Sequence, residues 1–286
     1  MNTTSLTSAS TPKPPDARPD VLVDADWLEA HLADPAVRIV EVDVSRAAHD
    51  QWHIGEAALW NVYTDLKDPG YQLVGPEAVR RLLEKSGITP DTTVVFYGYA
   101  PALGFWLMKL YRHADVRILD CSRDTWQQEG RPCDSTPAAL PAASYPLGEQ
   151  DDALRAAHTA VLDAIDDPGI TIIDVRSRDE YRGERFWPSG GMESGGRAGH
   201  VPSAVHQPAG DLYDDRGAFR PAAELRGVFP AADQAAGDLI TYCTIGGRAS
   251  TAWFVLTYLL GRDRVRVYDG SWAEWGRMTD TPVETA

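Results

Sequence analysis

The sequence predicts an α/β fold built from two tandem domains of the same kind, each a mainly parallel sheet flanked by helices. Short apolar runs typical of buried strands alternate with helical patterns along the chain, and the whole series occurs twice in the same order. Such alternation is typical of a parallel sheet covered by helices on both faces. With 286 residues, the chain is long enough for two domains of ordinary size.

Four pairs of segments correspond between the two halves at a nearly constant offset. These pairs are residues 37–44 with 170–177, 52–57 with 199–204, 92–99 with 238–245, and 116–126 with 265–275. The third pair aligns Gly98 with Cys243, and the last aligns Asp120 with Asp269. Four matches in one order indicate a tandem duplication of a domain of about 130 residues.

The helical patterns and the composition of the connecting segments divide the chain further. Apolar periodicity predicts helices over residues 77–86, 103–111 and 249–260, with Gly261 as a C-terminal cap of the last. The expected organisation is a disordered Ser-, Thr- and Pro-rich tail at 1–19, a first domain at 20–136, a proline-containing linker at 137–150 and a second domain at 151–286.

Composition excludes several classes of function. A net charge of -15 argues against nucleic acid as a partner, because phosphate binding needs a basic face. No apolar run is long enough for a membrane span, and the amino end lacks the apolar core of a signal peptide. Three cysteines without a C-x-x-C pair fit neither a disulfide framework nor a zinc site. We therefore expect a cytoplasmic protein with no metal and no membrane partner.

Cys243 is the candidate nucleophile of the chain. It stands where an apolar strand pattern ends and a glycine-bearing loop leads into a helical pattern. Loop N–H groups and a helix N-terminus that surround one atom stabilise a thiolate, and ligands of open parallel sheets bind at the carboxyl ends of strands. The alternative is a buried cysteine that packs as a small apolar side chain. The expected active-site loop comprises Thr244, Ile245, Gly246, Gly247 and Arg248.

Within this loop, Gly246 and Gly247 are expected to let the backbone turn tightly toward the sulfur. Arg248 has two possible functions, since a guanidinium can attract an anionic donor or brace the loop. A surface arginine at a helix start is the alternative. Protein tyrosine phosphatases and arsenate reductases also place a cysteine and an arginine on such a loop, but with five residues between them, whereas Cys243 and Arg248 have four. A binding module without catalysis would leave Cys243 unexplained.

The chain resembles the two-domain rhodanese sulfurtransferases over about residues 20 to 284. The resemblance rests on the duplication and on the segments Asp174-Val-Arg176, Gly199-His200-Val-Pro-Ser-Ala, Cys243-Thr-Ile-Gly-Gly-Arg and Tyr268-Asp-Gly-Ser-Trp-Ala-Glu-Trp. It implies a first domain that lost its cysteine, at Gly98, and a catalytic second domain. It also implies that Cys243 takes sulfur from thiosulfate or 3-mercaptopyruvate as a persulfide and passes it to a thiol, cyanide or a sulfur-carrier protein, without any cofactor.

The chain departs from the family near the nucleophile. Thr244 and Ile245 occupy the positions of the two basic residues typical of thiosulfate sulfurtransferases, and the Gly-Ser-Gly-Val-Thr loop of mercaptopyruvate enzymes is also missing. Glu180 replaces an expected substrate-binding arginine. The glycine-rich insertion at 182–198 suggests a mobile flap that could supply the positive charge instead.

Several further side chains have an expected function. Arg185 and Arg197 of the insertion are candidate contacts for the anionic donor, with solvated loop charges as the alternative. Trp272 is expected to pack in the core or to line the cleft. Asp174 and Arg176 are expected to form a buried pair under the loop. The remaining expectations concern core aromatic residues and histidines bonded to the backbone: Trp126, Trp275, His53 and His200.

Overall fold

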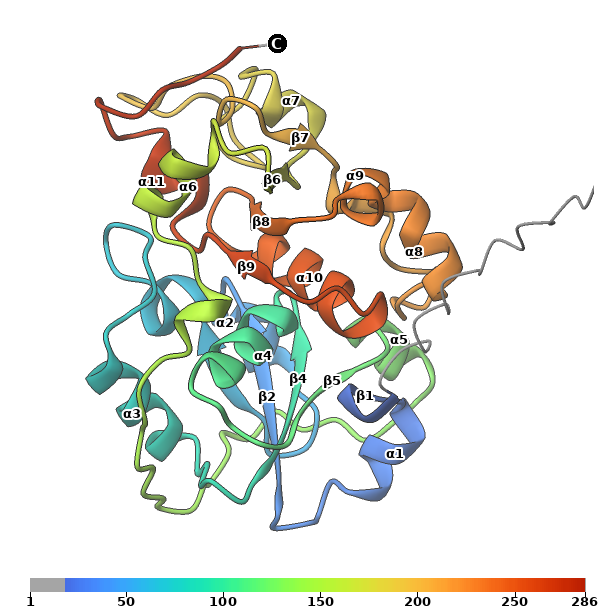
Figure 1. Cartoon of the computed structure of the whole chain (residues 1–286). Coiled ribbons are helices and arrows are strands. Elements are labelled where there is room, and N and C mark those ends of the chain that lie inside the picture. The colour runs from blue at the N-terminus through green and yellow to red at the C-terminus, as the bar shows by residue number, and fades with distance from the viewer. Residues whose placement is uncertain (1–18, 286) are drawn as a thin grey trace, which may run out of the picture.

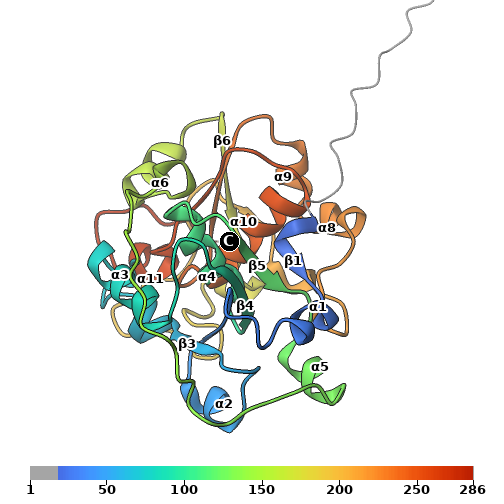
Figure 2. The same ribbon diagram turned by 90° about the horizontal axis from the view of Figure 1, so that it is seen from below.

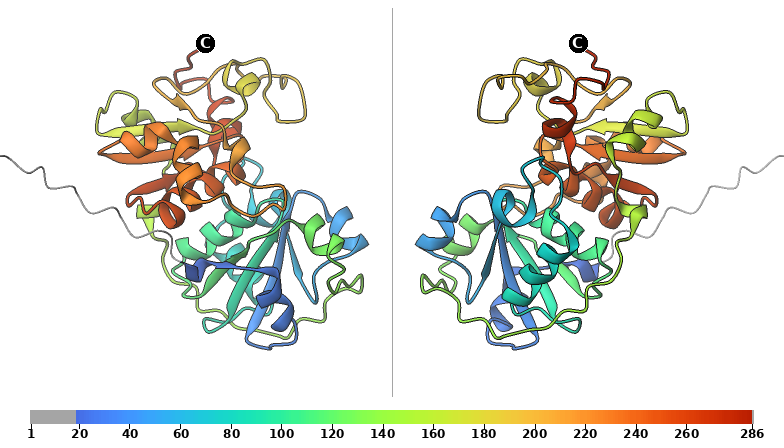
Figure 3. Two further views of the ribbon diagram at one scale, coloured as in Figure 1. Left: turned by 90° about the vertical axis from the view of Figure 1, so that its right-hand side faces the viewer. Right: turned by 90° about the vertical axis from the view of Figure 1, so that its left-hand side faces the viewer.

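The computed structural model describes residues 19–285, and Figure 1 shows a blue-to-green α/β unit below a yellow-to-red one. The tail expected at 1–19 lies outside the described residues apart from Pro19. Figure 3 shows from two sides that each half of the chain forms its own sheet and helices. Within residues 19–285, no helix combines the length and apolar character that crossing a membrane requires.

The first half contains a sheet of five parallel strands in the order β1-β5-β4-β2-β3. Its strands are β1 Leu22–Val23, β2 Val37–Asp43, β3 Ala58–Asn61, β4 Thr93–Gly98 and β5 Val116–Leu119. Its helices and helical turns are η1 Pro19–Val21, α1 Ala25–Ala30, α2 Arg46–Gln51, η2 Val62–Leu66, α3 Pro76–Lys85, α4 Pro101–Leu110 and α5 Arg123–Gln128. Central strands β2 and β4 are almost continuously buried, as expected for strands with helices on both faces.

The second half repeats this plan with four parallel strands in the order β7-β6-β8-β9. Its strands are β6 Ile170–Asp174, β7 Val205–His206, β8 Asp238–Tyr242 and β9 Val265–Val267. Its helices and helical turns are η3 Asp152–Leu154, α6 His158–Ala164, α7 Arg178–Tyr181, η4 Ala209–Asp211, α8 Ala222–Val228, α9 Pro230–Gln234, α10 Gly247–Phe254, η5 Val255–Leu259 and α11 Ser271–Trp275. The predicted α/β class with mainly parallel sheets is confirmed.

The duplication extends to individual hydrogen bonds. In the first sheet Glu41 lies opposite Tyr97, whose hydroxyl donates to the Glu41 carboxylate at 2.7 Å. In the second sheet Asp174 lies opposite Tyr242, whose hydroxyl donates to Asp174 in the same way at 2.5 Å. One step along each central strand stand Gly98 and Cys243. The first copy therefore reproduces the geometry around the candidate nucleophile without its thiol.

The two copies pack through the helices that follow Gly98 and Cys243. Figure 1 shows α4 beside α10, and Phe105 of α4 contacts Phe254 and Tyr258 edge-on, with ring centroids 4.9 and 5.1 Å apart. One apolar cluster runs through residues of both copies. Because each copy covers the apolar helix of the other, the carboxyl ends of both sheets are held close to this interface.

Residues 137–150, the predicted linker, contain no helix or strand and run past α3 up to α6 in Figure 2. Tyr145 in this stretch is 5 % exposed, and its hydroxyl bonds Nδ1 of His113 at 2.8 Å. The connection is therefore anchored to the first copy at Tyr145, while most of its other residues are exposed. The domain boundaries at 136 and 151 stay a prediction.

Each copy also reaches the other through a short hairpin. The first hairpin is closed by a bridge between Lys67 and Leu73, and the Leu73 N–H donates to the Asp269 carboxylate of the second copy at 2.7 Å. The second hairpin is closed by a bridge between Tyr213 and Phe219 and extends toward the first copy. The copies therefore exchange equivalent segments across their interface.

Candidate active site

The nucleophile loop connects β8 to α10 and depends on one glycine conformation. Gly246 has φ of +93°, in the left-handed region that favours glycine, and a Cβ there would lie 2.9 Å from the carbonyl oxygen of Asp269. Gly247 begins α10, and a Cβ at this position would meet only the Cβ of Ala100, at 3.6 Å. Gly246 is therefore the residue that lets the loop turn beneath the sulfur, while Gly247 opens the helix.

Cys243 is held by backbone and hydroxyl contacts on three sides. Its Sγ accepts the N–H of Gly246 at 3.2 Å, and its side chain and backbone together are only 1 % exposed. Its own N–H donates to Oγ of Ser271 at 3.1 Å, and its carbonyl accepts the N–H of Trp272 at 3.0 Å. Ser271 adopts a left-handed φ of +53°, a rare conformation for a side chain other than glycine. The sulfur is therefore fixed in place with a donor aimed at it.

The sulfur faces a cavity of about 280 Å³ between the two copies. The first copy contributes one wall, the insertion at 182–198 contributes a second, and the loop with the start of α10 forms the floor. The lining residues are Val44, Val62, Tyr63, Tyr99, Ala100, Trp187, Pro188, Ala209, Tyr213, Cys243, Thr244, Ile245, Gly247, Arg248 and Thr251. Aromatic and aliphatic side chains predominate, so the cavity shields a reactive sulfur species from bulk water.

Arg248 and Glu180 form the main ion pair of the loop. The two guanidinium nitrogens of Arg248 donate to the two carboxylate oxygens of Glu180, both at 2.8 Å. Thr244 donates its hydroxyl to the same carboxylate at 2.6 Å and accepts from Arg248 at 2.7 Å. Such bidentate pairing is the strong form of this contact. Of the two functions expected of Arg248, the geometry shows bracing of the loop, while the side chain also reaches the cavity wall.

Glu180 is fully buried, and its environment keeps it ionised. Burial would raise the pKa of this carboxyl group, but hydrogen bonds and charge from Arg248, together with Thr244 and Ser177, lower it to about 2. The pKa of Arg248 is raised, because Glu180 and Cys243 outweigh the effect of its own burial. Glu180, at a position where the family resemblance implies an arginine, is thus the counter-ion that Arg248 requires.

Asp174 and Arg176 form the buried pair expected beneath the loop. Both are fully buried; Nε of Arg176 lies 3.0 Å from both carboxylate oxygens and one terminal nitrogen lies 2.6 Å from the nearer one. The guanidinium also donates to the carbonyl of Gly199 at 2.9 Å and stacks on Trp272 at 4.5 Å. Trp272 is fully buried in this arrangement. It supports the floor and does not line the cavity.

The two arginines expected to contact the donor lie away from the cavity lining. Arg185 pairs with Asp179 at 3.3 Å and donates to the carbonyl of Pro188. Arg197 donates to the carbonyls of Thr281 and Trp275, at 2.5 and 2.7 Å. Their guanidinium groups bond to these neighbouring acceptors and not to the cavity, because a long arginine side chain bonds the nearest acceptors that the fold offers.

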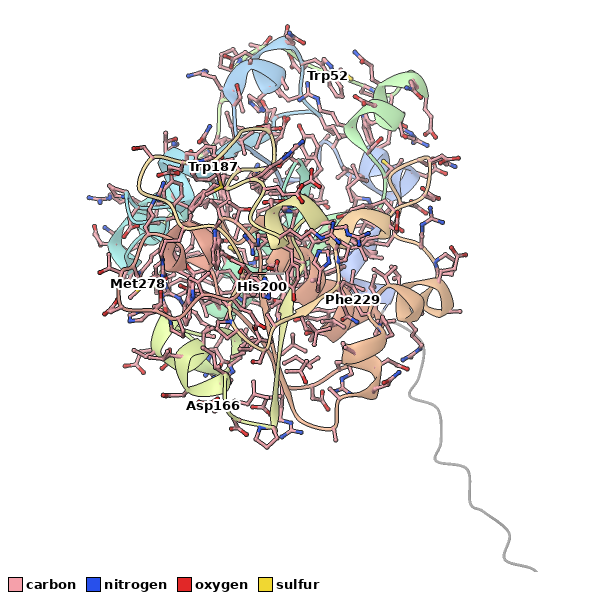
Figure 4. All side chains as sticks on the ribbon, turned by 90° about the horizontal axis from the view of Figure 1, so that it is seen from above. Trp52, Asp166, Trp187, His200, Phe229 and Met278 are labelled. Atoms are coloured by element: carbon pink, nitrogen blue, oxygen red, sulfur yellow. The ribbon has the colours of Figure 1, made fainter. Side chains whose placement is uncertain are left out.

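The insertion reaches the site through apolar residues instead. Trp187 and Pro188 line the cavity, and the Trp187 ring lies 5.6 Å from Tyr71 of the first copy. Seen from above in Figure 4, Trp187 lies between His200 and Trp52. The mobility expected of this segment stays a prediction.

The histidines and the remaining tryptophans have backbone partners, as expected. His53 bonds the carbonyls of His49 and Thr136, both at 3.1 Å, and His200 bonds the carbonyl of Tyr181 at 3.0 Å. Trp126 and Trp275 are fully buried, and their indole N–H groups donate to the carbonyls of Pro132 and Pro282. Among residues 19–285, no group of three or more His, Cys, Asp or Glu side chains is arranged to hold a metal ion.

The sequence led us to expect that the first copy helps to close the cleft, but not which of its residues do so. Tyr63 and Tyr99 line the cavity, and Lys67 lies buried under the nucleophile loop, with its ammonium 2.8 Å from the carbonyl oxygen of Asp269. Tyr63 and Lys67 follow β3 without any recognisable motif. The one available signal was the alignment of Asp120 with Asp269, which marks equivalent positions where the opposite hairpin arrives.

Comparison with known proteins agrees with this geometry. The model of the rhodanese-like domain matches residues 157–278. The chain is 38% identical over 278 residues to the sulfur carrier protein TtuD of Thermus thermophilus, covering 93% of this chain and 97% of the relative. It is 39% identical over 275 residues to a protein named as a thiosulfate sulfurtransferase in Mycobacterium bovis, covering 94% and 99%.

The fold also matches a solved structure. The anaerobic ergothioneine biosynthesis enzyme of Chlorobium limicola, crystallised with trimethyl histidine, aligns with a TM-score of 0.80 at 23% identity over 93% of this chain and 70% of that one. At this identity the match concerns the fold. The relatives of nearly equal length carry the assignment, and the chain belongs to the rhodanese-type sulfurtransferase family.

Proposed function

We propose that this protein transfers sulfane sulfur from a small anionic donor to a thiophilic acceptor through a persulfide on Cys243. The observation that carries the proposal is the position of Sγ, which accepts the Gly246 N–H at 3.2 Å and faces a cavity of about 280 Å³. A cavity of this size accommodates thiosulfate, the donor we favour. The name of the Mycobacterium bovis relative points to the same donor.

In the first half-reaction, the Cys243 thiolate attacks the outer sulfur of thiosulfate. A sulfur–sulfur bond forms between the enzyme and the outer sulfur, the original sulfur–sulfur bond of the donor breaks, and sulfite leaves with the bonding electron pair. The enzyme retains a persulfide anion. The N–H of Gly246 and the start of α10 face this side of the loop and stabilise its negative charge.

In the second half-reaction, a thiolate attacks the outer sulfur of the persulfide. The new persulfide leaves on the acceptor, and Cys243 returns as a thiolate, so that no proton or electron is left over. Cyanide reacts in the same way and yields thiocyanate. Because donor and acceptor meet the same sulfur in turn, the kinetics are ping-pong. The apolar wall of the cavity protects the persulfide between the two steps.

Two variants of this function differ only in the partner molecule. 3-Mercaptopyruvate could serve as the donor, with pyruvate as the product. The sulfur could also pass to a carrier protein, and the similarity to a protein named sulfur carrier protein TtuD favours a relay of this kind. Both use the same persulfide on Cys243.

Phosphate ester hydrolysis is disfavoured by the state of Arg248. A phosphatase needs its loop arginine free to bind the oxyanion, whereas both terminal nitrogens of Arg248 are bonded to Glu180 at 2.8 Å. The loop is also one residue shorter than in those enzymes. A binding module without catalysis would not need the backbone N–H that the loop directs at the Cys243 sulfur.

Sulfite release without an acceptor tests the proposal. Mixing the protein with thiosulfate should release about one sulfite per chain in a single burst, and mercaptopyruvate should be compared by its release of pyruvate. Cys243→Ser should release none, while Cys133→Ser, which changes an exposed cysteine outside the cavity, should behave as wild type. Absence of a burst with either donor, combined with hydrolysis of an aryl phosphate, would overturn the proposal.

A further inference from the structure

Lys67 is a buried cation beneath the nucleophile loop, and it comes from the first copy. Its side chain is 1% exposed, and its ammonium donates to the carbonyl of Asp269 at 2.8 Å and lies 3.4 Å from the Asp269 carboxylate. The same ammonium would stand 3.2 Å from a Cβ built on Gly246. Gly246 is the residue whose N–H bonds Cys243. Lys67 therefore lies directly behind the part of the loop that holds the sulfur.

The charges under the loop do not balance without the thiolate. The Asp269 carboxylate is shared by two cations, Lys67 and Arg155, whose Nε lies 2.8 Å away. On the other side of the loop, the charge of Arg248 is matched by Glu180. Arg155 is 24 % exposed, so solvent screens part of its charge, whereas Lys67 is buried and shares its carboxylate with this second cation. An incompletely paired buried charge is costly, and a negative sulfur on Cys243 would lower that cost.

Burial is the largest electrostatic effect on Lys67 and lowers the pKa of its ammonium below the ordinary value. Asp269, by charge and hydrogen bonding, and Cys243 raise this pKa and offset burial only in part, while Arg155 lowers it. The interaction between two charges is mutual. An ammonium on Lys67 and a negative sulfur on Cys243 would therefore attract each other.

The first copy provides an internal comparison. Its Asp120 corresponds to Asp269 and accepts a backbone N–H of the opposite hairpin in the same way, from Phe219 at 2.8 Å. The residue that corresponds to Lys67 in that hairpin is Tyr213, which carries no charge. Burial raises the pKa of Asp120, as for a carboxyl group without the compensation that Asp269 receives. The hairpin that reaches the first copy, where Gly98 replaces the cysteine, therefore delivers no cation at this position.

We propose that Lys67 is a positioning residue that the first copy delivers through its hairpin to stabilise the thiolate and persulfide of Cys243. This gives the copy without a cysteine a direct task in the chemistry of the other copy. The proposal rests on Cys243 as the sulfur carrier.

The test is the pH profile of Cys243 alkylation by iodoacetamide, followed by peptide mass spectrometry. In Lys67→Met the profile should move up by about one pH unit, with about tenfold slower alkylation on its rising part. Lys67→Arg should restore most of the rate because the charge returns. Lys85→Met, which removes an exposed charge on α3, should match wild type. An unchanged profile in a folded Lys67→Met protein would overturn the proposal.

A second measurement covers the case in which Lys67→Met does not fold. In the wild-type background, the side-chain ¹⁵Nζ signal of Lys67 can be titrated by NMR and compared with that of Cys243→Ser. Loss of the thiolate should make Lys67 lose its ammonium proton at a lower pH, and identical titrations would contradict the coupling. Alkylation and NMR need no sulfur donor. A shifted profile without any sulfite burst would therefore reject the sulfur-transfer function alone.

Discussion

Replacement of Glu180 by glutamine tests the idea that the loop is braced by a buried ion pair. The substitution keeps the shape of the side chain but removes the negative charge that faces Arg248. The carboxyl pKa falls from 4.5 to about 2 in the folded protein, and Glu180 is fully buried. At about 1.36 kcal/mol per unit, this shift corresponds to about 3 kcal/mol of stability at neutral pH.

The pH dependence of this contribution has a defined sign. Because the folded-state pKa is depressed, the stabilisation is fully present above about pH 5 and is lost as the pH falls through 4.5 toward 2. At about pH 3 roughly 1 kcal/mol remains, since most of the shift has been titrated away. The difference between wild type and Glu180→Gln should narrow accordingly on acidification.

Urea unfolding of both proteins at pH 7 and pH 3 measures this difference. Glu180→Gln should cost about 3 kcal/mol at pH 7 and about 1 kcal/mol at pH 3. Glu224→Gln, at an exposed carboxylate that pairs with Arg220 at 3.1 Å, should cost under about 0.5 kcal/mol at either pH. A loss under about 0.5 kcal/mol for Glu180→Gln, equal at both pH values, would refute the reasoning.

Three further substitutions probe the loop and the cavity wall. Gly246→Ala should destabilise the protein by about 2 kcal/mol in urea unfolding and slow sulfur loading at least tenfold, because a methyl group would lie 2.9 Å from the Asp269 carbonyl at φ of +93°. Gly247→Ala, which meets only Ala100, should change the unfolding free energy by under about 0.5 kcal/mol; equal losses for both alanines would contradict this account. Trp187→Ala should raise KM for the donor about fivefold with kcat nearly unchanged in steady-state assays, and a fall in kcat alone would assign Trp187 to the chemical step.

The fold was predictable because its determinants are local in sequence. Three elements are each recognisable from a short stretch of sequence: the buried strand over residues 170–174, the strand before Cys243 and the helix after it. The duplication adds a comparison inside the chain, since Gly98 marks the turn where the first copy functions without a thiol. These signals require no knowledge of tertiary contacts.

The details of the site depend on contacts between residues that are far apart in the sequence. Arg248 meets Glu180 across 68 positions of sequence, so the acidic residue had no visible partner. Arg185 and Arg197 were expected at the cavity because of their charge, but long flexible side chains follow acceptors that only the folded chain presents, here Asp179 and Thr281.

Lys67 was the largest omission. Its partner Asp269 is 202 positions away, and the hairpin that carries it has a tyrosine at the corresponding place in the other copy. A search for sequence shared by the two copies could not reveal Lys67, because the corresponding residue of the other copy is different. Only the exchange of hairpins across the interface brings the lysine to the nucleophile.

The most direct test of the central claim is the mass of the peptide that contains Cys243 after the protein is treated with thiosulfate and the persulfide is trapped by alkylation. We predict an added mass of about 32 Da, one sulfur atom, on Cys243, and no added sulfur on Cys121 or Cys133. Sulfur on Cys121 or Cys133, or loading that persists in Cys243→Ser, would contradict the account.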